Sequence, residues 1–415
     1  MKRVRHLLAA VAALALTAAL LALGASPAAA APAKAAPKGH GTCKSTAPGS
    51  QARRHGTGWT CGKAEPVAVP SQAIAKATAK ATDTEGTANE PSDGPCPKGR
   101  NADRHNYCWG EKFTITAFDT DGKETGHSVV VALSFARLSS SSGKWTENLA
   151  VKATEMEGEA KTVSMDLSAT CSGLCTVDAP AWGGAPIELS LGDERTGNLS
   201  FTSSVTKGTN SFIYPTYTSF GTILEAGGGL ANPVSWNGHQ LRCDAQVGQY
   251  PGCIVMGHMA NVTIRESAYG AAAIAYAWAQ SNLHGGNFGT ETKPLQRNSG
   301  GRTEAAKKRR QSCTAAPLPF KPDPSVANDS CDEFPFASSV QGGTNGSDCT
   351  EIIPRKTDGV WHVDVVRDSP HGSNAPCIRA HVPLPENTGA GGELGRAVVA
   401  DRILEMEWYE VILAP

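Results

Sequence analysis

The chain carries twelve cysteines, and their spacing constrains the fold more than any other feature of the sequence. An even number of cysteines in an exported chain usually indicates disulfide bonds. The cysteines fall into close sequential couples, and we expect pairing within each couple: Cys43 with Cys61, Cys96 with Cys108, Cys171 with Cys175, Cys243 with Cys253, Cys313 with Cys331, and Cys349 with Cys377. Spacing alone does not fix the connectivity. Zinc binding at Cys171 and Cys175 is an alternative, but no second Cys/His couple of zinc-finger type follows them.

The N-terminus has the pattern of an export signal. Basic residues between Lys2 and Arg5 precede an Ala/Leu/Val run from Leu7 to Leu23, and small residues follow up to Ala31. We therefore predict a signal peptide over residues 1–31 and a secreted, extracellular protein with no membrane attachment after cleavage. A membrane anchor is the rival interpretation, but the run of about 17 residues is short for a span of roughly 20.

Residues 32–95 are rich in Ala, Pro, Lys, Thr and Ser and poor in large apolar side chains. Such a segment buries too little apolar surface to offset its ordering entropy, so we expect a low-complexity linker that Cys43 and Cys61 could staple locally. The formal net charge of the whole chain is −1. This value argues against a passive nucleic-acid binder, which normally has a strong basic excess.

Residues 96–262 predict an all-β, sandwich-like domain. An Asp121-Gly122 turn separates two alternating apolar runs, which is a strong hairpin signal. Further strand-like runs follow at Trp145–Val151, 163–167, 187–191, 199–205 and 212–217. Trp145, Trp182 and Trp236 could form a sugar- or wall-binding face, although burial in the core is the usual role of such residues.

Residues 263–415 change to α+β order and predict a second, smaller domain. An Ala-rich stretch at 267–280 and a Lys/Arg-rich stretch at 303–312 both favour helices. Strands are expected at 359–367, 377–382 and 405–413, with a helix from about residue 391 to 400.

Two motifs in this second domain carry the chemistry. Asp332 and Glu333 are adjacent acids among apolar residues, and adjacent acids repel each other unless a positive charge lies near them. Asn387 and Glu393 flank a glycine-rich stretch that we expect to open a helix. Carboxylate and amide oxygens suit a hard divalent cation, and exposed N–H groups at a helix N-terminus favour phosphate.

The order of these motifs resembles the NucA/NucB family of secreted bacterial deoxyribonucleases. The resemblance covers about residues 265–415 and includes Cys331–Ser338, the Val340-Gln341-Gly342-Gly343 run, and Glu386–Gly391 after Val382-Pro383. It implies non-specific endonucleolytic cleavage of DNA, a small ββα-metal-like core, and one Mg²⁺ or Mn²⁺ ion as cofactor.

The resemblance also assigns roles to individual positions. Asp332 matches the catalytic aspartate, Glu333 stands beside it, and Asn387 matches the asparagine of the metal-binding helix. The metal ligand expected about ten residues after that asparagine has no counterpart, because Gly395-Arg396-Ala397 lacks a carboxylate, and Gln341 replaces an acid of some relatives. We therefore expect Glu393, about one turn earlier, to substitute for it. The full set of expected site residues is catalytic Asp332 and Glu333, metal-binding Asn387, Glu393 and Glu386, and substrate-binding Lys307, Lys308, Arg309, Arg310, Gly389 and Gly391.

Ordinary structural roles compete with each of these interpretations. Asp332 and Glu333 could form a solvated loop, Asn387 could cap a helix, and the basic run could be a solvated face. His362, His371 and His381 could supply a base, although a surface or packing role is more common for a lone histidine.

The sequence thus predicts a secreted, metal-dependent endonuclease with DNA as its substrate. The first alternative is a secreted protein that binds cell wall or polysaccharide through its β domain and carries a degenerate nuclease module. The second alternative is an antibacterial toxin that uses the same nuclease chemistry.

Overall fold

The computed structural model describes residues 35–68, 100–284 and 288–415. The described residues from 36 to 415 belong to one unit, which is mostly β with several sheets and few helices. The expected signal peptide at 1–31 and the residue Cys96 lie outside the described residues. Among the described residues, no helix is both long and apolar enough to span a membrane.

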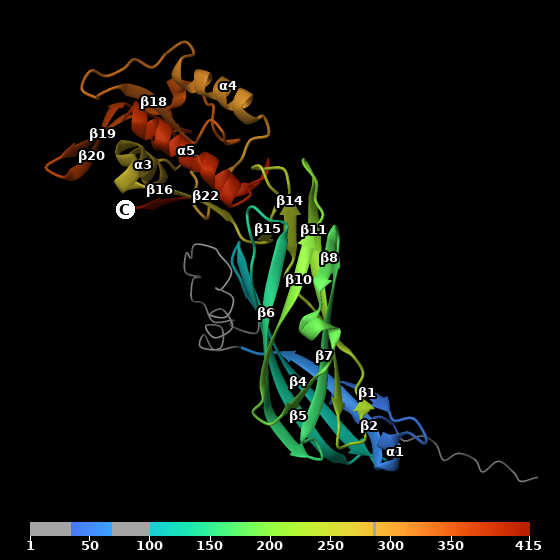
Figure 1. Ribbon diagram of the computed structural model, residues 1–415. Coiled ribbons are helices and arrows are strands. Elements are labelled where there is room, and N and C mark those ends of the chain that lie inside the picture. Colours follow the sequence, from blue (N-terminus) through green and yellow to red (C-terminus); the bar gives the residue numbers. More distant parts are fainter. Residues whose placement is uncertain (1–34, 69–99, 285–287) are drawn as a thin grey trace, which may run out of the picture. The chain divides into compact units, whose positions relative to one another are not determined.

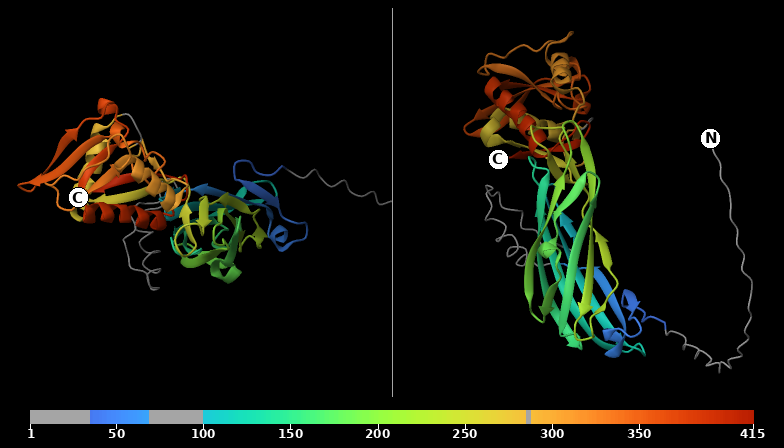
Figure 2. Two further views of the ribbon diagram at one scale, coloured as in Figure 1. Left: turned by 90° about the horizontal axis from the view of Figure 1, so that it is seen from above. Right: turned by 45° about the vertical axis from the view of Figure 1, so that its right-hand side comes forward.

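Two antiparallel sheets make up the first part of this unit. The strand order is β1-β2-β4-β5-β6-β10-β8 in one sheet, with β3 on β4, and β15-β14-β11-β7-β9 in the other, with β12 and β13 on β11. The strands of these sheets run alongside each other in two further views (Figure 2). Their bounds are β1 Thr42–Ser45, β2 Thr57–Pro66, β3 Arg100–Ala102, β4 Asn106–Asp119, β5 Glu124–Arg137, β6 Lys144–Gly158, β7 Thr162–Ser172, β8 Cys175–Ala179, β9 Ile187–Ser190, β10 Glu194–Ser203, β11 Asn210–Ile223, β12 Gly229–Leu230, β13 Val234–Asn237, β14 Leu241–Asp244 and β15 Gly252–Val255.

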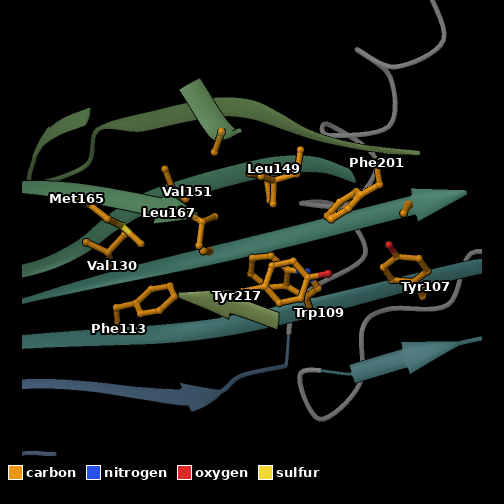
Figure 3. Close-up of a cluster of buried hydrophobic side chains, with 14 of the residues drawn as sticks. Tyr107, Trp109, Phe113, Val130, Leu149, Val151, Met165, Leu167, Phe201 and Tyr217 are labelled. Atoms are coloured by element: carbon orange, nitrogen blue, oxygen red, sulfur yellow. The ribbon is translucent and has the colours of Figure 1, made fainter. Parts of the chain in front are cut away.

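One hydrophobic core fills the space between the two sheets. Inward-facing side chains of β4, β5, β6 and β10 meet those of β7 and β11, as Figure 3 shows for Trp109, Leu149, Met165 and Tyr217. The predicted hairpin is confirmed, since Asp121-Gly122 connects β4 and β5 and Gly122 has φ +83°. All the expected strands of this region are present.

The three tryptophans do not form an exposed binding face. Trp145 is 4% exposed and stacks on Phe201. Trp236 packs against Trp109, and Trp182 is partly buried with its indole N–H donating to a strand carbonyl. The core role is therefore the one that the structure supports.

The predicted linker is wrong for residues 36–68. This segment forms β1, the short helix α1 (Gln51–Arg54) and β2, and β2 pairs with β4 from Thr57 to Pro66. Gly58 and Gly62 let β2 lie close to neighbouring backbone, and Trp59 and Cys61 are buried against Phe118. The burial comes from a distant partner strand, which local composition does not indicate.

The second part of the unit is α+β and has its own hydrophobic core. One small sheet has the order β16-β22-β17, with β16 parallel and β17 antiparallel to β22, and the other has the order β18-β21-β19-β20. Helix α3 packs on both sheets, α5 packs on α3, β16, β18 and β21, and α4 packs on β18 (Figure 1). The bounds are β16 Ala260–Arg265, α3 Glu266–Asn282, β17 Leu295–Gln296, α4 Gly301–Cys313, β18 Asp329–Phe334, β19 Thr350–Thr357, β20 Val360–Arg367, β21 Ile378–Pro383, α5 Leu384–Ala400 and β22 Trp408–Ala414, with short 3-10 turns at Gly346–Asp348 and Gly372–Asn374. A further 3-10 turn, Ala181–Gly184, lies between β8 and β9 in the first part.

A buried ionic network joins the two cores. Arg402, which follows α5 at φ +48°, is fully buried and donates from Nε and Nη2 to the Asp244 carboxylate at 2.9 and 2.6 Å. Glu407 accepts from Arg242 at 2.8 Å and from Arg104 at 2.6 Å. Buried charges of this kind are stable only when they are paired and hydrogen-bonded, as they are here.

Five disulfides are confirmed among the described residues. They join Cys43 to Cys61, Cys171 to Cys175, Cys243 to Cys253, Cys313 to Cys331, and Cys349 to Cys377. The bond between Cys171 and Cys175 rules out the zinc alternative there, because disulfide sulfurs carry no thiolate to bind a metal.

Candidate active site

Asp332 and Glu333 lie on β18, the edge strand of the four-stranded sheet. Adjacent residues of a strand point to opposite faces, so Asp332 meets α3 while Glu333 meets α4. Each side chain is only 5% exposed. At the strand edge both line one cavity of about 300 Å³, which α4 and α5 also border. The acidic pair is therefore a buried feature of a cavity and not a solvated loop.

Asp332 has one side-chain partner among the described residues. The Tyr276 hydroxyl donates a hydrogen bond to its Oδ2 at 2.8 Å. The Tyr276 ring is held by Phe334 and Phe336, with ring centroids 5.2 and 5.1 Å away. Burial and the neighbouring charge of Glu333 raise the pKa of Asp332 well above its ordinary value. Burial thus favours the protonated form of Asp332, and Tyr276 holds the side chain in a fixed orientation.

Glu333 is held less tightly. Arg309 Nε lies 3.4 Å from its Oε1, and the Arg309 side chain is 62% exposed. Burial raises the pKa of Glu333 to about 7, although the Arg309 charge opposes this shift. Cys313 and Cys331 lie beside the Glu333 carboxylate, but their sulfurs are joined in a disulfide and cannot ligate a metal.

Asn387 reaches the same cavity from α5. Its Nδ2 donates to Ser330 Oγ at 3.1 Å and to the Cys331 carbonyl at 3.0 Å. These two bonds fix the side chain against β18 and leave the carbonyl oxygen, Oδ1, without a hydrogen-bond partner among the described residues. The structure therefore places an amide oxygen beside the two predicted acids.

Glu393 and Glu386 lie elsewhere, contrary to the expectation that they join Asn387 at a metal. Six residues separate Asn387 from Glu393, which places them about 120° apart around a helix. Glu393 accepts from Tyr269 at 2.8 Å and from Arg396 Nη2 at 2.6 Å, outside the cavity. Glu386 accepts the Ala271 N–H at 2.5 Å, where α3 is kinked at Gly270.

The glycine-rich stretch also differs from expectation. Helix α5 begins at Leu384, so Gly389 and Gly391 lie within the helix and not at an anion-binding N-terminus. A Cβ at Gly389 would come within 2.9 Å of the Tyr269 ring, which explains a glycine there by close packing of α3 and α5. Gly391 does line the cavity.

The basic run of α4 is divided between structural and cavity roles. Lys308 donates to the carbonyls of Ser339 and Val340 at 2.6 and 3.0 Å, and burial lowers its pKa. Lys307 forms an exposed pair with Glu304 at 3.8 Å. Of the four expected basic residues, Arg309 lines the cavity, and Lys307, Lys308 and Arg310 do not.

Several cavity residues were missed from the sequence, among them Arg297, Asn298, Arg302 and Tyr276. Arg302 lies seven residues before Arg309 and therefore on the same face of α4; helical spacing could have identified it. Tyr276 was treated only as part of the α3 pattern, and its contact with Asp332 crosses 56 residues, so no local signal indicates it.

The three histidines that could have supplied a base do not line this cavity. His381 is 3% exposed and lies between Asp329, at 2.6 Å, and Glu351, at 3.2 Å. His362 and His371 are exposed. The structural role of His381 is therefore an internal ionic contact.

A larger cavity, of about 1260 Å³, lies elsewhere in the unit and includes His105 and Asp401. These two side chains pair with each other at 3.0 Å. This cavity contains neither predicted motif, so we place the chemistry in the smaller one.

Comparison with known families defines the class of this region. A family model matches residues 283–360, which include Asp332 and Glu333. The family is deoxyribonuclease NucA/NucB, and the match supports the presence of a domain of that family in the C-terminal region of the chain. The match includes Cys331–Ser338 and ends before α5. No curated protein and no solved structure matches the chain.

Proposed function

We propose that the protein is a secreted, metal-dependent endonuclease that hydrolyses extracellular DNA. One observation carries the proposal. The cavity brings together Asp332, Glu333 and Asn387 from a strand and a helix that are far apart in the sequence. The match to the deoxyribonuclease family supports DNA as the substrate.

The donor set of the cavity fits a divalent cation. Two carboxylates and one amide oxygen are hard ligands of the kind that Mg²⁺ and Mn²⁺ prefer, and Mg²⁺ commonly uses only one or two protein carboxylates together with water. Both acids are buried, and among the described residues the exposed Arg309, which pairs with Glu333, is the single cation in an ion pair with either of them. Asn387 and Glu333 would hold the ion. When bound, it would offset negative charge on the phosphate and leaving oxygen.

The side chains of the cavity account for the other requirements of phosphodiester hydrolysis. Asp332 acts as the general base, because it lines the cavity and Tyr276 holds it by one oxygen, which leaves the other oxygen for a water. Arg302 and Arg309 border the cavity and are positioned to bind the phosphate backbone. Glu393 and Glu386 have no part in this proposal.

Secretion is supported by the five disulfides of the described residues, because such bonds persist in oxidising compartments. The leader-like sequence of residues 1–31 agrees with this location.

The proposal is tested by plasmid digestion with the oxidised protein in Mg²⁺, in Mn²⁺ and in EDTA. We expect cutting that requires a divalent ion, and we expect Asp332→Asn to lower the rate by about 10³-fold, as for loss of a general base. Asn387→Ala should raise the metal concentration needed for half-maximal rate.

Glu393→Gln is the matched control, since Glu393 lies on α5 but faces away from the cavity. It should cut at the wild-type rate. A folded wild-type protein that cuts no DNA with either ion would exclude the proposal and favour a lapsed active site. Full activity of Asp332→Asn would remove the assigned base.

A further inference from the structure

A group of potential metal ligands lies on two strands of the first part of the unit, outside both cavities. His127 lies on β5, and Glu155 and Glu157 lie on β6, the neighbouring antiparallel strand. His127 is directly opposite Glu157, and Glu155 is opposite Val129, two residues further along β5. Alternate residues of a strand share a face, so the register places all three side chains on one face of the sheet. Val130, which alternates with His127 and Val129, belongs to the hydrophobic core, so this face is turned away from the core.

The three side chains are close enough to share one ion. One ligand atom from each of them lies within 4.8 Å of a ligand atom from each of the other two. Ligand atoms that share a tetrahedral Zn²⁺ at about 2.1 Å are about 3.4 Å apart. Glu155 and Glu157 are exposed, so rotation of their side chains can close the remaining distance while the strands stay in place.

The imidazole ring of His127 is already oriented for such a site. Its Nδ1 lies 2.7 Å from Oε1 of Glu124, and its Nε2 lies 3.0 Å from Oε1 of Glu155. A neutral imidazole donates from one nitrogen only. When Nδ1–H donates to Glu124, the lone pair of Nε2 faces Glu155. Metal-binding histidines usually have this arrangement, with one nitrogen on the ion and the other N–H on a carboxylate.

The charges around the ring favour a cation more than a proton. Among the described residues, His127 is the single ion-pair partner of Glu124 and of Glu155, and the Glu157 carboxylate has no side-chain hydrogen bond or ion pair. A protonated His127 satisfies Glu124 and Glu155 but leaves Glu157 without a partner. A divalent cation at Nε2 offsets the charges of both Glu155 and Glu157.

We propose that His127, Glu155 and Glu157 bind a divalent transition-metal ion of the Zn²⁺ class, with Glu124 as the positioning residue of His127. Mg²⁺ and Ca²⁺ prefer oxygen ligands alone, whereas one imidazole with two carboxylates suits Zn²⁺. The ion links β5 to β6 and stabilises the folded sheet, because it binds the folded state only. This site is separate from the proposed nuclease cavity and does not depend on the nuclease function.

The first test counts bound ions. Tag-free, oxidised wild type and variants are dialysed to equilibrium against Zn²⁺, with excess Mg²⁺ to compete for the carboxylates of the active-site cavity, and the bound Zn²⁺ is measured. We expect His127→Ala to bind one Zn²⁺ fewer than the wild type. Glu157→Gln should raise the Kd of this ion by at least about tenfold, and Glu124→Gln by about tenfold, as for the loss of a carboxylate that orients a metal-binding histidine.

His371→Ala is the matched control. His371 is an exposed histidine that lies 3.6 Å from a single carboxylate, that of Asp348. This variant should bind as many Zn²⁺ ions as the wild type. If the wild type and His127→Ala bind the same number, His127 forms ion pairs only and the inference is wrong.

The second test measures thermal unfolding with Zn²⁺ and with EDTA. Zn²⁺ should raise the unfolding midpoint of the wild type and of His371→Ala, and it should raise that of His127→Ala less. In EDTA, Glu157→Gln should unfold at the wild-type temperature, because Glu157 has no side-chain partner among the described residues to lose. Weaker Zn²⁺ binding by this variant therefore reports a lost ligand and not a folding defect. An equal Zn²⁺ effect on the wild type and on His127→Ala would also overturn the inference, while leaving the proposed nuclease function intact.

Discussion

Two regions of this protein bury carboxylates in opposite ways. In the β core, Glu147 is fully buried and accepts hydrogen bonds from Tyr107, Trp109, Ser134 and Tyr217. In the C-terminal region, Asp332 is almost as buried but has one side-chain donor and faces a cavity.

The comparison distinguishes a buried carboxylate that stabilises a core from one that is open to a cavity. Glu147 has donors on both oxygens and lines neither cavity described above, so its hydrogen bonds organise the core. Asp332 keeps capacity for further partners and has space beside it. Burial alone therefore does not single out a candidate catalytic carboxylate; the low number of donors and the cavity beside it make Asp332 the candidate.

The largest expected effect is that of Glu147→Ala on the free energy of unfolding. Glu147→Ala leaves two tyrosines, a tryptophan and a serine without their acceptor, and we expect it to lower the free energy of unfolding by about 3–5 kcal/mol. Asp332→Asn should leave the free energy of unfolding unchanged or raise it. Urea denaturation of both variants measures these changes.

The exposed Glu159→Ala is the control for Glu147→Ala and should match the wild type. The folded fraction of Glu147→Ala should retain its nuclease rate per molecule. If Asp332→Asn were the more destabilising of the two, the distinction between the two regions would fail.

A third acid, Glu351, tests whether charge pairing gives a different pH response. Burial by itself raises its pKa, but hydrogen bonds from His381 and Arg379 outweigh burial and lower the pKa to about 2 from an ordinary value of 4.5. Because the folded pKa is the lower one, Glu351 stabilises the fold above pH 4.5, and this contribution is lost as the pH falls toward 2.

Glu351→Gln should therefore cost on the order of 2 kcal/mol at pH 7 and progressively less between pH 4.5 and pH 2. Denaturant titrations of wild type and variant across this range measure the difference. Asp364→Asn, which removes an exposed pair with Arg355, serves as the control and should show little change. A difference that stays constant with pH would contradict the assigned pairing.

The smallest expected effect concerns the single donor to Asp332. Tyr276→Phe removes a hydrogen bond that lowers the Asp332 pKa, so this pKa should rise and the acid limb of kcat/KM should move to higher pH. We expect the rate at neutral pH to fall by about fivefold, as for loss of one hydrogen bond to a charged group.

Tyr269→Phe is the matched control, since the Tyr269 hydroxyl bonds to Glu393 and Arg396 outside the cavity. Its pH profile should follow that of the wild type. An unshifted profile for Tyr276→Phe would mean that this hydrogen bond does not tune the base.

Local chemistry made much of the fold predictable. The Asp121-Gly122 hairpin and the helices of the C-terminal region follow from turn residues and propensity, and five disulfides followed from cysteine spacing. Contacts between distant residues account for the failures. Strand β2 is buried by β4, and the phase of α5, fixed by its start at Leu384, removes Glu393 from the cavity.

In the candidate site, too, the sequence predicted individual residues but not the contacts between distant ones. Asp332, Glu333, Arg309 and Asn387 were expected from motifs and lie in one cavity. The hydrogen bond from Tyr276 could not be expected, because it depends on how α3 packs against a strand 56 residues later.

Arg402 has a consequence for the modularity of this chain. Arg402 follows α5, the helix that carries Asn387, and its guanidinium is neutralised by Asp244 of β14. A fragment cut near residue 260 would leave that cation without its counter-charge and release the end of α5. The sequence composition changes near residue 263, but cutting the chain there would not yield two independently folded proteins.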